Sequence, residues 1–430
     1  MKHKKTIKKV AKHLPISAPY IKLRDLQRTA DAQNHEIIGL RQAVDRLEAR
    51  NDEWAAEVRS LRGAAESLTI VWPVSPKDIA AADWTKPHTQ NSAKKSNPPF
   101  TINWVVPHMG PVSGGHADIF RTINYLESKG HTCNIYFYDA LKSSSLDEIK
   151  KNLKNYSPLK AKLFYNADNM ADCDAIFATN WHTAYPVFNF RGKGKKYYYV
   201  QDFEPYFEPV GTYSTLAENT YRFGLRGITL GSWLTTKLSK EYGMECDYFE
   251  LGLNSKEYHL TNQKLRKKIL FYARPVTPRR GFELGVLALE IFHKKHPEYE
   301  INFVGWDISP YKIPFSYKNL GILSQSQLND LYNNCAVALV LSFTNMSLLP
   351  LELLASGCRP VVNDSEHTRM VSYSDQLKYS LASPNALAES LHDSINSLNE
   401  AQIEEMSEYT KSYEWDNSNK VIEDILLKEL

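Results

Sequence analysis

The sequence has no long apolar run. Nowhere do about 18 uncharged apolar residues follow one another, the length that a membrane-spanning helix needs. The first residues also lack the apolar core of a secretory signal. We therefore expect a soluble or membrane-peripheral protein. A hydrophobic content of 43% over 430 residues excludes a largely disordered chain and suffices for two or three domains.

Cysteine is scarce and charge of one sign does not dominate. Five cysteines stand without C-x-x-C spacing, and their odd number argues against a disulfide framework, so a cytoplasmic location fits best. Lys and Arg number 52 against 49 Asp and Glu, which gives no argument for a nucleic-acid partner.

Basic residues are concentrated at the N-terminus. Residues 1–13 hold six Lys, two His and no acid. Each Lys near an anionic bilayer contributes about 1 kcal/mol, so the segment 1–20 is expected to hold the protein peripherally at the inner face of the membrane. Binding of another polyanion, nucleic acid included, is the alternative.

Residues 21–63 carry an uninterrupted heptad pattern from Leu23 to Leu61. The a positions include Ile37 and Val44, d positions include Leu40 and Leu47, and Asn51 stands at an a position, a combination that favours two parallel strands in one register. The pattern predicts a parallel coiled coil that makes a homodimer. A single amphipathic helix packed on the globular body is the alternative.

The remaining chain divides by composition and periodicity. Five prolines within 64–99 indicate a linker. Two series of alternating strands and helices follow, over 100–262 and 263–400, and a polar helical segment, 401–430, ends the chain. Expected strands include 102–107, 133–139, 267–275, 301–306, 337–342 and 359–363, with helices at 118–130, 326–335 and 348–356. The fold class is therefore α/β, with two Rossmann-like domains facing a cleft.

A Gly-rich loop lies between the first strand and first helix of the N-terminal domain. Ser113, Gly114 and Gly115 let backbone amides approach an anion or an acceptor. A full G-x-G-x-x-G fingerprint is missing, and a tight connection is the alternative.

Cations and a carboxylate follow strands of the C-terminal domain. Arg274 comes just after a strand, and Arg280 just before a helix, where a diphosphate would fit. Ser347 and Leu348 precede a later helix and offer amides to phosphate, while Glu352 on that helix can accept hydrogen bonds from a ribose. A solvated basic loop and a helix-dipole partner are the alternatives.

These residues resemble family 4 of the GT-B glycosyltransferases over roughly 100–400. The family's Arg, its basic residue before Gly and its Glu-containing segment match Arg274, Arg280-Gly281 and Glu352 to Gly357. The Glu that the family usually has upstream falls on Thr344. The resemblance implies retaining transfer of a sugar from a nucleotide-diphosphate donor to a glycan acceptor.

The segment around Gln201 is similar to the rhamnosyltransferase branch of that family. Asp202, Glu204 and Pro205 carry the similarity, which implies dTDP-L-rhamnose as donor and an acceptor in surface-glycan or polysaccharide synthesis. A lipid-linked glycan is one such acceptor. The deoxyribose of this donor would leave Glu352 only the 3′ hydroxyl to bind.

Catalytic groups are expected in the cleft. Asp202 or Glu204 would act as general base or stabilise positive charge on the sugar, and His116 would bond a hydroxyl or the leaving phosphate. His182 is a further candidate. Surface ion pairs and structural histidines are the competing explanations.

Neither a metal nor another cofactor is expected. The D-x-D at Asp172 and Asp174 suits Mg²⁺, but the arginines already balance a diphosphate and the acids precede a buried strand. A phosphorylase or epimerase is a competing enzyme class. A nucleotide-sugar-binding scaffold without catalysis, organised by the coiled coil, is the non-enzyme alternative.

Overall fold

The computed structural model describes residues 70–86, 96–110, 113–142, 144–369 and 375–430. The basic segment 1–20 and the predicted coiled coil 21–63 lie outside these ranges, so the homodimer and the membrane contact stay predictions. Within the ranges, no helix combines the length and apolarity needed to cross a bilayer. Residues 72–430 form one unit that contains both sheets.

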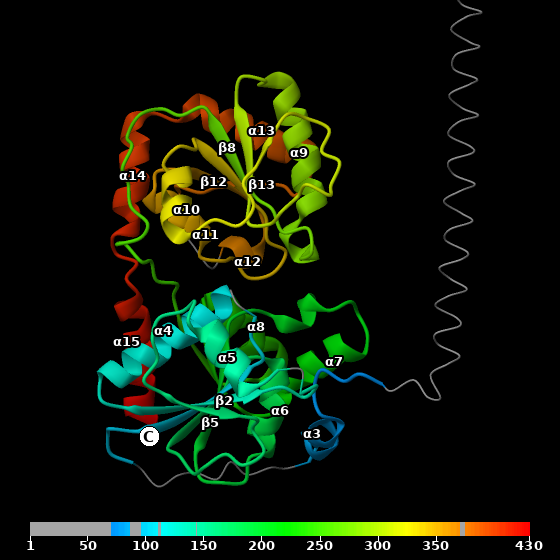
Figure 1. Cartoon of the computed structure of the whole chain (residues 1–430), viewed down its shortest axis with the longest axis vertical. Coiled ribbons are helices and arrows are strands. Elements are labelled where there is room, and N and C mark those ends of the chain that lie inside the picture. The colour runs from blue at the N-terminus through cyan, green and yellow to red at the C-terminus, as the bar shows by residue number, and fades with distance from the viewer. Residues whose placement is uncertain (1–69, 87–95, 111–112, 143, 370–374) are drawn as a thin grey trace, which may run out of the picture. The chain divides into compact units, whose positions relative to one another are not determined.

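Seven parallel strands build the first sheet, in the order β3-β2-β1-β4-β5-β6-β7. Two of them, β2 and β5, are labelled in Figure 1. The central strands are buried on both faces, as helix-covered parallel strands must be, and Tyr197 to Tyr199 in β5 are all 0% exposed. The edge strands β3 and β7 are partly exposed. The strands are β1 (Thr101–Pro107), β2 (Thr132–Tyr138), β3 (Lys162–Tyr165), β4 (Ala175–Ala178), β5 (Lys195–Val200), β6 (Arg226–Leu230) and β7 (Cys246–Phe249).

Helices connect these strands, and the predicted strand–helix–strand unit at the start of the domain is confirmed. Helix α4 begins where the side chain of Ser113 accepts a hydrogen bond from His116 N. The helices are α4 (Gly114–Ser128), α5 (Leu146–Leu153), α6 (Trp181–Asn189), η1 (Glu204–Phe207), α7 (Thr212–Asn219), η2 (Thr220–Arg222) and α8 (Ser232–Tyr242).

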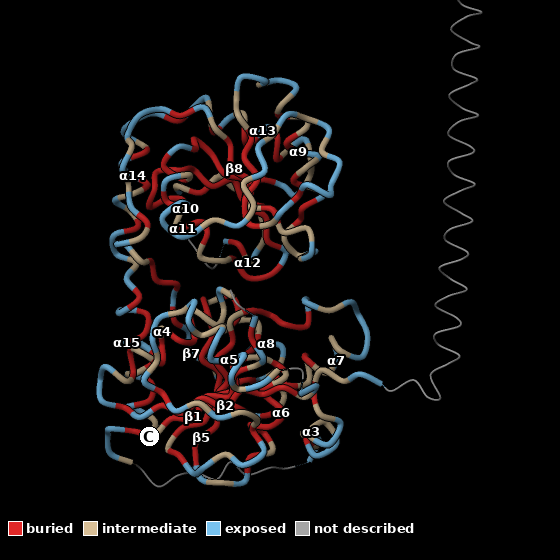
Figure 2. Tube along the Cα trace, viewed as in Figure 1, coloured by how far each residue is buried: buried red, intermediate tan, exposed pale blue. Residues whose placement is uncertain are grey.

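The second sheet has six parallel strands in the order β10-β9-β8-β11-β12-β13. Its elements confirm the predicted second alternation, and buried residues line the strands of both sheets (Figure 2). They are β8 (Lys268–Tyr272), η3 (Pro278–Arg280), α9 (Phe282–Lys295), β9 (Glu300–Val304), β10 (Lys318–Asn319), α10 (Gln325–Tyr332), β11 (Val337–Val340), α11 (Leu349–Ala355), β12 (Arg359–Asn363), α12 (Glu366–Arg369), β13 (Lys378–Ser380) and α13 (Pro384–Ser397).

Both sheets reverse their strand order at one point. In the first, β1 lies between β2 and β4, and in the second, β8 lies between β9 and β11. Connections leave in opposite directions at such a reversal, so the loops after the two central strands separate and leave space for a ligand at the carboxyl ends. The loops after β8 and β11 therefore lie where this fold is expected to bind a ligand.

Part of the segment predicted to be a linker is folded onto the first sheet's helices. It contains the short helix α3 (Pro76–Ala81), which contacts α6. Asp78 accepts a hydrogen bond from Tyr138 Oη at 2.8 Å, and its carbonyl oxygen accepts one from Asn189 Nδ2 at 2.9 Å. The apolar Val74 and Ala82 on either side of the helix are buried and anchor it.

The C-terminal segment forms two helices. α14 (Glu400–Thr410) contacts α11 of the second sheet, whereas α15 (Trp415–Glu429) contacts α4 and β7 of the first. Between them the chain crosses beside Gly252, where an added Cβ would lie 2.5 Å from Trp415 Cα, so only glycine allows this approach. Asn419 accepts a hydrogen bond from Thr122 Oγ1 at 2.9 Å, which fixes α15 against α4.

Candidate functional site

The Gly-rich loop after β1 lies against the loop after β5. Gln201 Nε2 donates to the carbonyl oxygen of Gly115 at 3.2 Å, and an added Cβ at Gly115 would meet that side chain at 3.4 Å. Ser113 caps α4, and Gly114 begins it. The structure therefore brings the predicted Ser113-Gly114-Gly115 loop next to the Gln201-Asp202 segment.

His116 is held by the protein at both ring nitrogens. Nε2 lies 3.2 Å from the carbonyl oxygen of Pro107, and Nδ1 lies 2.9 Å from Ser113 Oγ. A carbonyl only accepts, so Nε2 carries the proton and Nδ1 accepts from the hydroxyl. Burial lowers the pKa of His116, which keeps the ring neutral. In this arrangement the imidazole fastens the Gly-rich loop to the end of β1.

Asp202 follows β5 and is only 8% exposed. Its Oδ1 accepts hydrogen bonds from Phe203 N and Asn345 N, both at 2.8 Å, and its Oδ2 accepts from Thr344 Oγ1 at 2.8 Å. Burial raises the pKa of Asp202, against the hydrogen bonds from Asn345 and Thr344. The carboxylate thus already has three protein donors, two of them from the second sheet's loop after β11.

Glu204 begins η1 and is 4% exposed. Its Oε2 accepts hydrogen bonds from Trp181 N and from Tyr198 Oη, the latter at 3.2 Å. Burial raises the pKa of Glu204 to about 8, while the bonds from Trp181 and Tyr198 act in the opposite direction. Near neutral pH the side chain is therefore mostly the neutral acid, which suits a proton donor better than a base.

The other residues considered in the first sheet's half have local partners. His182 Nδ1 lies 2.8 Å from Asn180 Nδ2, and burial lowers the pKa of His182 to about 4. Asp172 accepts from Lys193 N at 2.9 Å, and Asp174 accepts from Thr101 N at 2.7 Å. These two carboxylates tie the ends of strands together. In the described ranges, no group of three or more His, Cys, Asp or Glu is placed to hold a metal ion.

Three arginines gather after β8. The guanidinium of Arg274 lies 5.9 Å from the Trp306 ring, and that of Arg279 lies 4.0 Å from the Phe207 ring. Arg280 Nη1 donates to Ser342 Oγ, after β11, at 2.9 Å. Burial lowers the pKa of Arg280 to about 10, with Asp202 acting to raise it and the other two arginines to lower it. Confined cations of this kind are stabilised by an anionic ligand.

Glu352 lies in the first turn of α11, and this helix begins directly after Ser347 and Leu348. Burial raises the pKa of Glu352 to about 8, Arg121 acts to lower it and Asp118 to raise it. Arg121 and Asp118 belong to α4 and form an ion pair at 2.7 Å. Glu352 therefore lies within electrostatic range of charged residues on α4 of the first sheet's half.

Replacing Glu352 with glutamine is expected to stabilise the protein in a pH-dependent way. Because the pKa of about 8 in the folded protein exceeds the ordinary 4.5, the folded chain keeps a proton that the unfolded chain loses between these values. Wild-type stability therefore falls as the pH rises through this window. Urea unfolding should show that Glu352→Gln raises the free energy of unfolding by about 1–2 kcal/mol at pH 8 and leaves it unchanged at pH 4. The exposed Glu366→Gln is the control, and an equal gain at both pH values would contradict the assignment.

Sequence reasoning missed several residues of this region. Ser342 and Asn345 flank Thr344 and are buried, but their partners are Arg280, Gln201 and Asp202, far away in the chain. A polar loop after a strand was the only signal that pointed to them.

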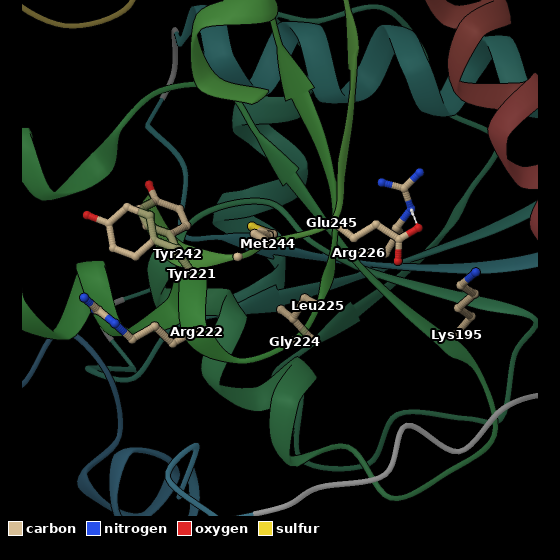
Figure 3. Close-up of a pocket in the computed structure, with 10 residues that line it drawn as sticks. Lys195, Tyr221, Arg222, Gly224, Leu225, Arg226, Tyr242, Met244 and Glu245 are labelled. Carbon is tan, nitrogen blue, oxygen red and sulfur yellow. Dashed lines mark ion pairs between the residues drawn. The ribbon is translucent and has the colours of Figure 1, made fainter. Parts of the chain in front are cut away.

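A cavity of about 350 Å³ lies elsewhere, at the beginnings of β5, β6 and β7 (Figure 3). Lys195 and Arg226 line it, and both bond Glu429 at 2.8 Å. Arg222, also in its wall, pairs with Glu218 at 3.0 Å. Since these cations are balanced within the protein and lie at the amino ends of the strands, the cavity is separate from the predicted donor site.

The arrangement of the two sheets corresponds to a known fold. The two parallel sheets have the GT-B-like arrangement of solved glycosyltransferases. The structure of a glycosyltransferase from Rickettsia africae aligns with a TM-score of 0.55 at 15% identity, covering 77% of this chain and 99% of that one. Anabaena HepE in complex with UDP and glucose aligns with a TM-score of 0.57 at 11% identity, over 76% of this chain and 100% of its own.

Particular relatives come from sequence. Residues 267–392 match the family described as WsaF, C-terminal domain, and this range contains Arg274, Arg280 and Glu352. The chain is 28% identical over 361 residues to the O-antigen biosynthesis protein RfbC of Myxococcus xanthus, covering 81% of this chain and 28% of RfbC. It thus spans little more than a quarter of that relative's length.

Proposed function

We propose that the protein is a glycosyltransferase that moves a sugar from a nucleotide-diphosphate donor onto a glycan acceptor. The observation that carries the proposal is the cluster of Arg274, Arg279 and Arg280 after β8, beside the loop after β11 at the strand reversal of the second sheet. Half-buried cations at the carboxyl ends of parallel strands suit a diphosphate. The match of 267–392 to the WsaF C-terminal domain and the UDP complex of HepE support this ligand class.

The proposed donor is dTDP-L-rhamnose and the proposed product is a polysaccharide or surface glycan. The rhamnosyltransferase-like segment at Gln201 and the similarity to RfbC support this choice. Glu352, in α11 of the same half as the arginines, would accept a hydrogen bond from the deoxyribose 3′ hydroxyl. Its raised pKa fits a carboxyl that awaits a polar ligand.

Transfer proceeds with retention, and the leaving diphosphate receives most of the stabilisation. Arg274 and Arg280 neutralise charge as the bond from sugar to phosphate breaks, with the amides around Ser347 and Leu348 as further donors. The acceptor hydroxyl attacks the sugar as the bond from sugar to phosphate breaks, and its proton passes to an oxygen of the leaving diphosphate, with both substrates held in place. His116 orients the Gly-rich loop. The arginines balance the diphosphate charge, so no metal or other cofactor is required.

The remaining partners follow from the sequence. Residues 21–63 make the homodimer, and residues 1–13 attach the protein to anionic lipid on the cytoplasmic face, where a lipid-linked acceptor would be found. No role for nucleic acid is proposed.

A nucleotide-sugar-binding scaffold without catalysis is the second candidate. Two observations favour it. Protein donors already bond the Asp202 carboxyl group, and Thr344 stands where the related family has Glu. Binding of a nucleotide sugar without turnover in the presence of candidate acceptors would distinguish the scaffold from the enzyme.

Calorimetric titration with dTDP, UDP and GDP tests the donor class and the site together. We expect wild type to bind dTDP in preference to the others, and Arg274→Ala to weaken dTDP binding by about 10-fold, because a charge-assisted contact to phosphate is lost. Lys294→Ala, an exposed change at the far end of α9, is the control. If wild type binds none of the three nucleotides, the proposed function is wrong.

A further inference from the structure

The loop after β11 contains two buried polar residues whose partners lie in the other half of the molecule. Thr344 is 1% exposed and Asn345 is 2% exposed. Thr344 Oγ1 donates to Asp202 Oδ2 and Asn345 N donates to Asp202 Oδ1, both at 2.8 Å. Buried polar groups are costly unless they are bonded, so this contact favours one relative placement of the two loops.

The side chain of Asn345 extends the same contact to two further strands. Its Nδ2 donates to the carbonyl oxygen of Gln201 at 2.8 Å, after β5, and to that of Leu230 at 3.2 Å, at the end of β6. Four hydrogen bonds therefore join one loop of the second sheet to the carboxyl ends of two neighbouring strands of the first. We call Asp202, Thr344 and Asn345 the bridge.

The bridge is connected to Arg280 through Ser342. Arg280 Nη1 donates to Ser342 Oγ at 2.9 Å. The same hydroxyl lies 3.2 Å from the carbonyl oxygen of Thr344 and 2.9 Å from that of Asn345. The main chain adds a bond from Phe343 N to the carbonyl oxygen of Arg279 at 2.9 Å. The course of the loop, which the bridge holds, therefore determines where the Arg280 guanidinium lies.

Asp202 is poorly placed to act as a general base. A base needs an oxygen that the substrate can reach, whereas three donors surround the Asp202 carboxylate and the residue is 8% exposed. Burial raises the pKa of Asp202, and the hydrogen bonds and the nearby charges of Arg280 and Arg279 act in the opposite direction. A carboxyl group enclosed by donors in this way is suited to hold them in place.

We propose that Thr344 and Asn345 are positioning residues that, bonded to Asp202, hold Arg280 in the orientation that binds the donor diphosphate. The inference rests on the proposed function, since it assigns these residues to the same nucleotide site. It also assigns Asp202 a positioning role in place of proton transfer. A consequence is that nucleotide affinity depends on a hydroxyl that need not touch the nucleotide.

The test compares Thr344→Val, Thr344→Ser, Asp202→Asn and the Thr344→Val/Asp202→Asn double variant, titrated with dTDP in the chain of residues 1–430. Thr344→Val and Asp202→Asn should each weaken dTDP binding by about 10-fold, and the double variant should be no weaker than either, because both changes act on the same hydrogen bond between Thr344 and Asp202. Thr344→Ser keeps the hydroxyl and should retain most of the affinity. Thr410→Val is the control, since its hydroxyl bonds only locally, to the Ser407 carbonyl oxygen at 2.8 Å.

Thermal unfolding of each variant separates positioning from general stability. If Thr344→Val and Thr410→Val lower the melting temperature alike and both bind dTDP as tightly as wild type does, the bridge is structural and the inference is overturned. Unchanged dTDP affinity in Asp202→Asn together with lost turnover would instead restore a base role and also overturn it. Wild type that binds no nucleotide would overturn the proposed function itself, an outcome distinct from the other two.

Discussion

Arg280→Ala is expected to weaken binding of dTDP by about 100-fold or more and to reduce sugar transfer at least as much. The guanidinium is the most confined of the three arginines after β8, and burial lowers its pKa to about 10. Its bond to Ser342 directs it toward the loop after β11. A buried charge that meets a diphosphate away from water contributes far more than an exposed one.

Calorimetry with dTDP and a transfer assay with dTDP-L-rhamnose would measure the two effects of Arg280→Ala. Arg280→Lys retains charge without the planar fork and should lie between wild type and alanine. If alanine and lysine variants both bind dTDP like wild type, the diphosphate does not lie against Arg280.

Arg226→Ala is expected to lower the free energy of unfolding by about 3 kcal/mol. Arg226 begins β6, its side chain is 8% exposed, and its Nε bonds Glu429 Oε1 at 2.8 Å near the end of α15. It also pairs with Asp247. Removing it leaves the Glu429 carboxylate, itself 13% exposed, with fewer partners, and loosens the C-terminal helix. Chemical denaturation at pH 7 measures the loss.

The pH dependence of the Arg226→Ala effect adds a second check. Burial raises the pKa of Glu429, but hydrogen bonds from Lys195 and Arg226 outweigh it, so the pKa lies below the ordinary 4.5. The stabilisation is present above that ordinary value and is lost as the pH falls through the lowered one. The difference in free energy of unfolding between wild type and Arg226→Ala should therefore become smaller at acidic pH. The exposed pair of Arg369 and Asp364 is the control, and an equal cost for Arg369→Ala would contradict a special role for Arg226.

Much of the fold was predictable because its signals are local. The predicted strand 102–107, helix 118–130 and strand 133–139 follow from a change of apolar period with a Gly-containing turn between, and the structure confirms them as β1, α4 and β2. The segment 64–99 was harder to interpret. Its prolines indicate a linker, yet Pro76 also suits the first turn of a helix, and α3 forms because Val74 and Ala82 find apolar contacts that the sequence does not identify.

The candidate site divides in the same way. Position relative to strands and helices was enough to single out Arg274, Arg280 and Glu352 from the sequence. In the structure Arg274 follows β8, Arg280 ends η3 just before α9, and Glu352 lies in α11. The sequence also indicated Asp202, but as a group open to substrate. In the fold, its carboxylate is enclosed by donors from both halves.

By itself, the sequence determined the elements, their alternation into two Rossmann-like sheets and the type of charge that follows each strand, because neighbouring residues specify these features. It also carries the heptads of 21–63, which stay a prediction. Tertiary structure alone decided that Asp202 meets Thr344, 142 residues away, and that α15 ends against Arg226. No local pattern specifies such partners, since burial and hydrogen bonding across the chain select them only when both sheets are complete.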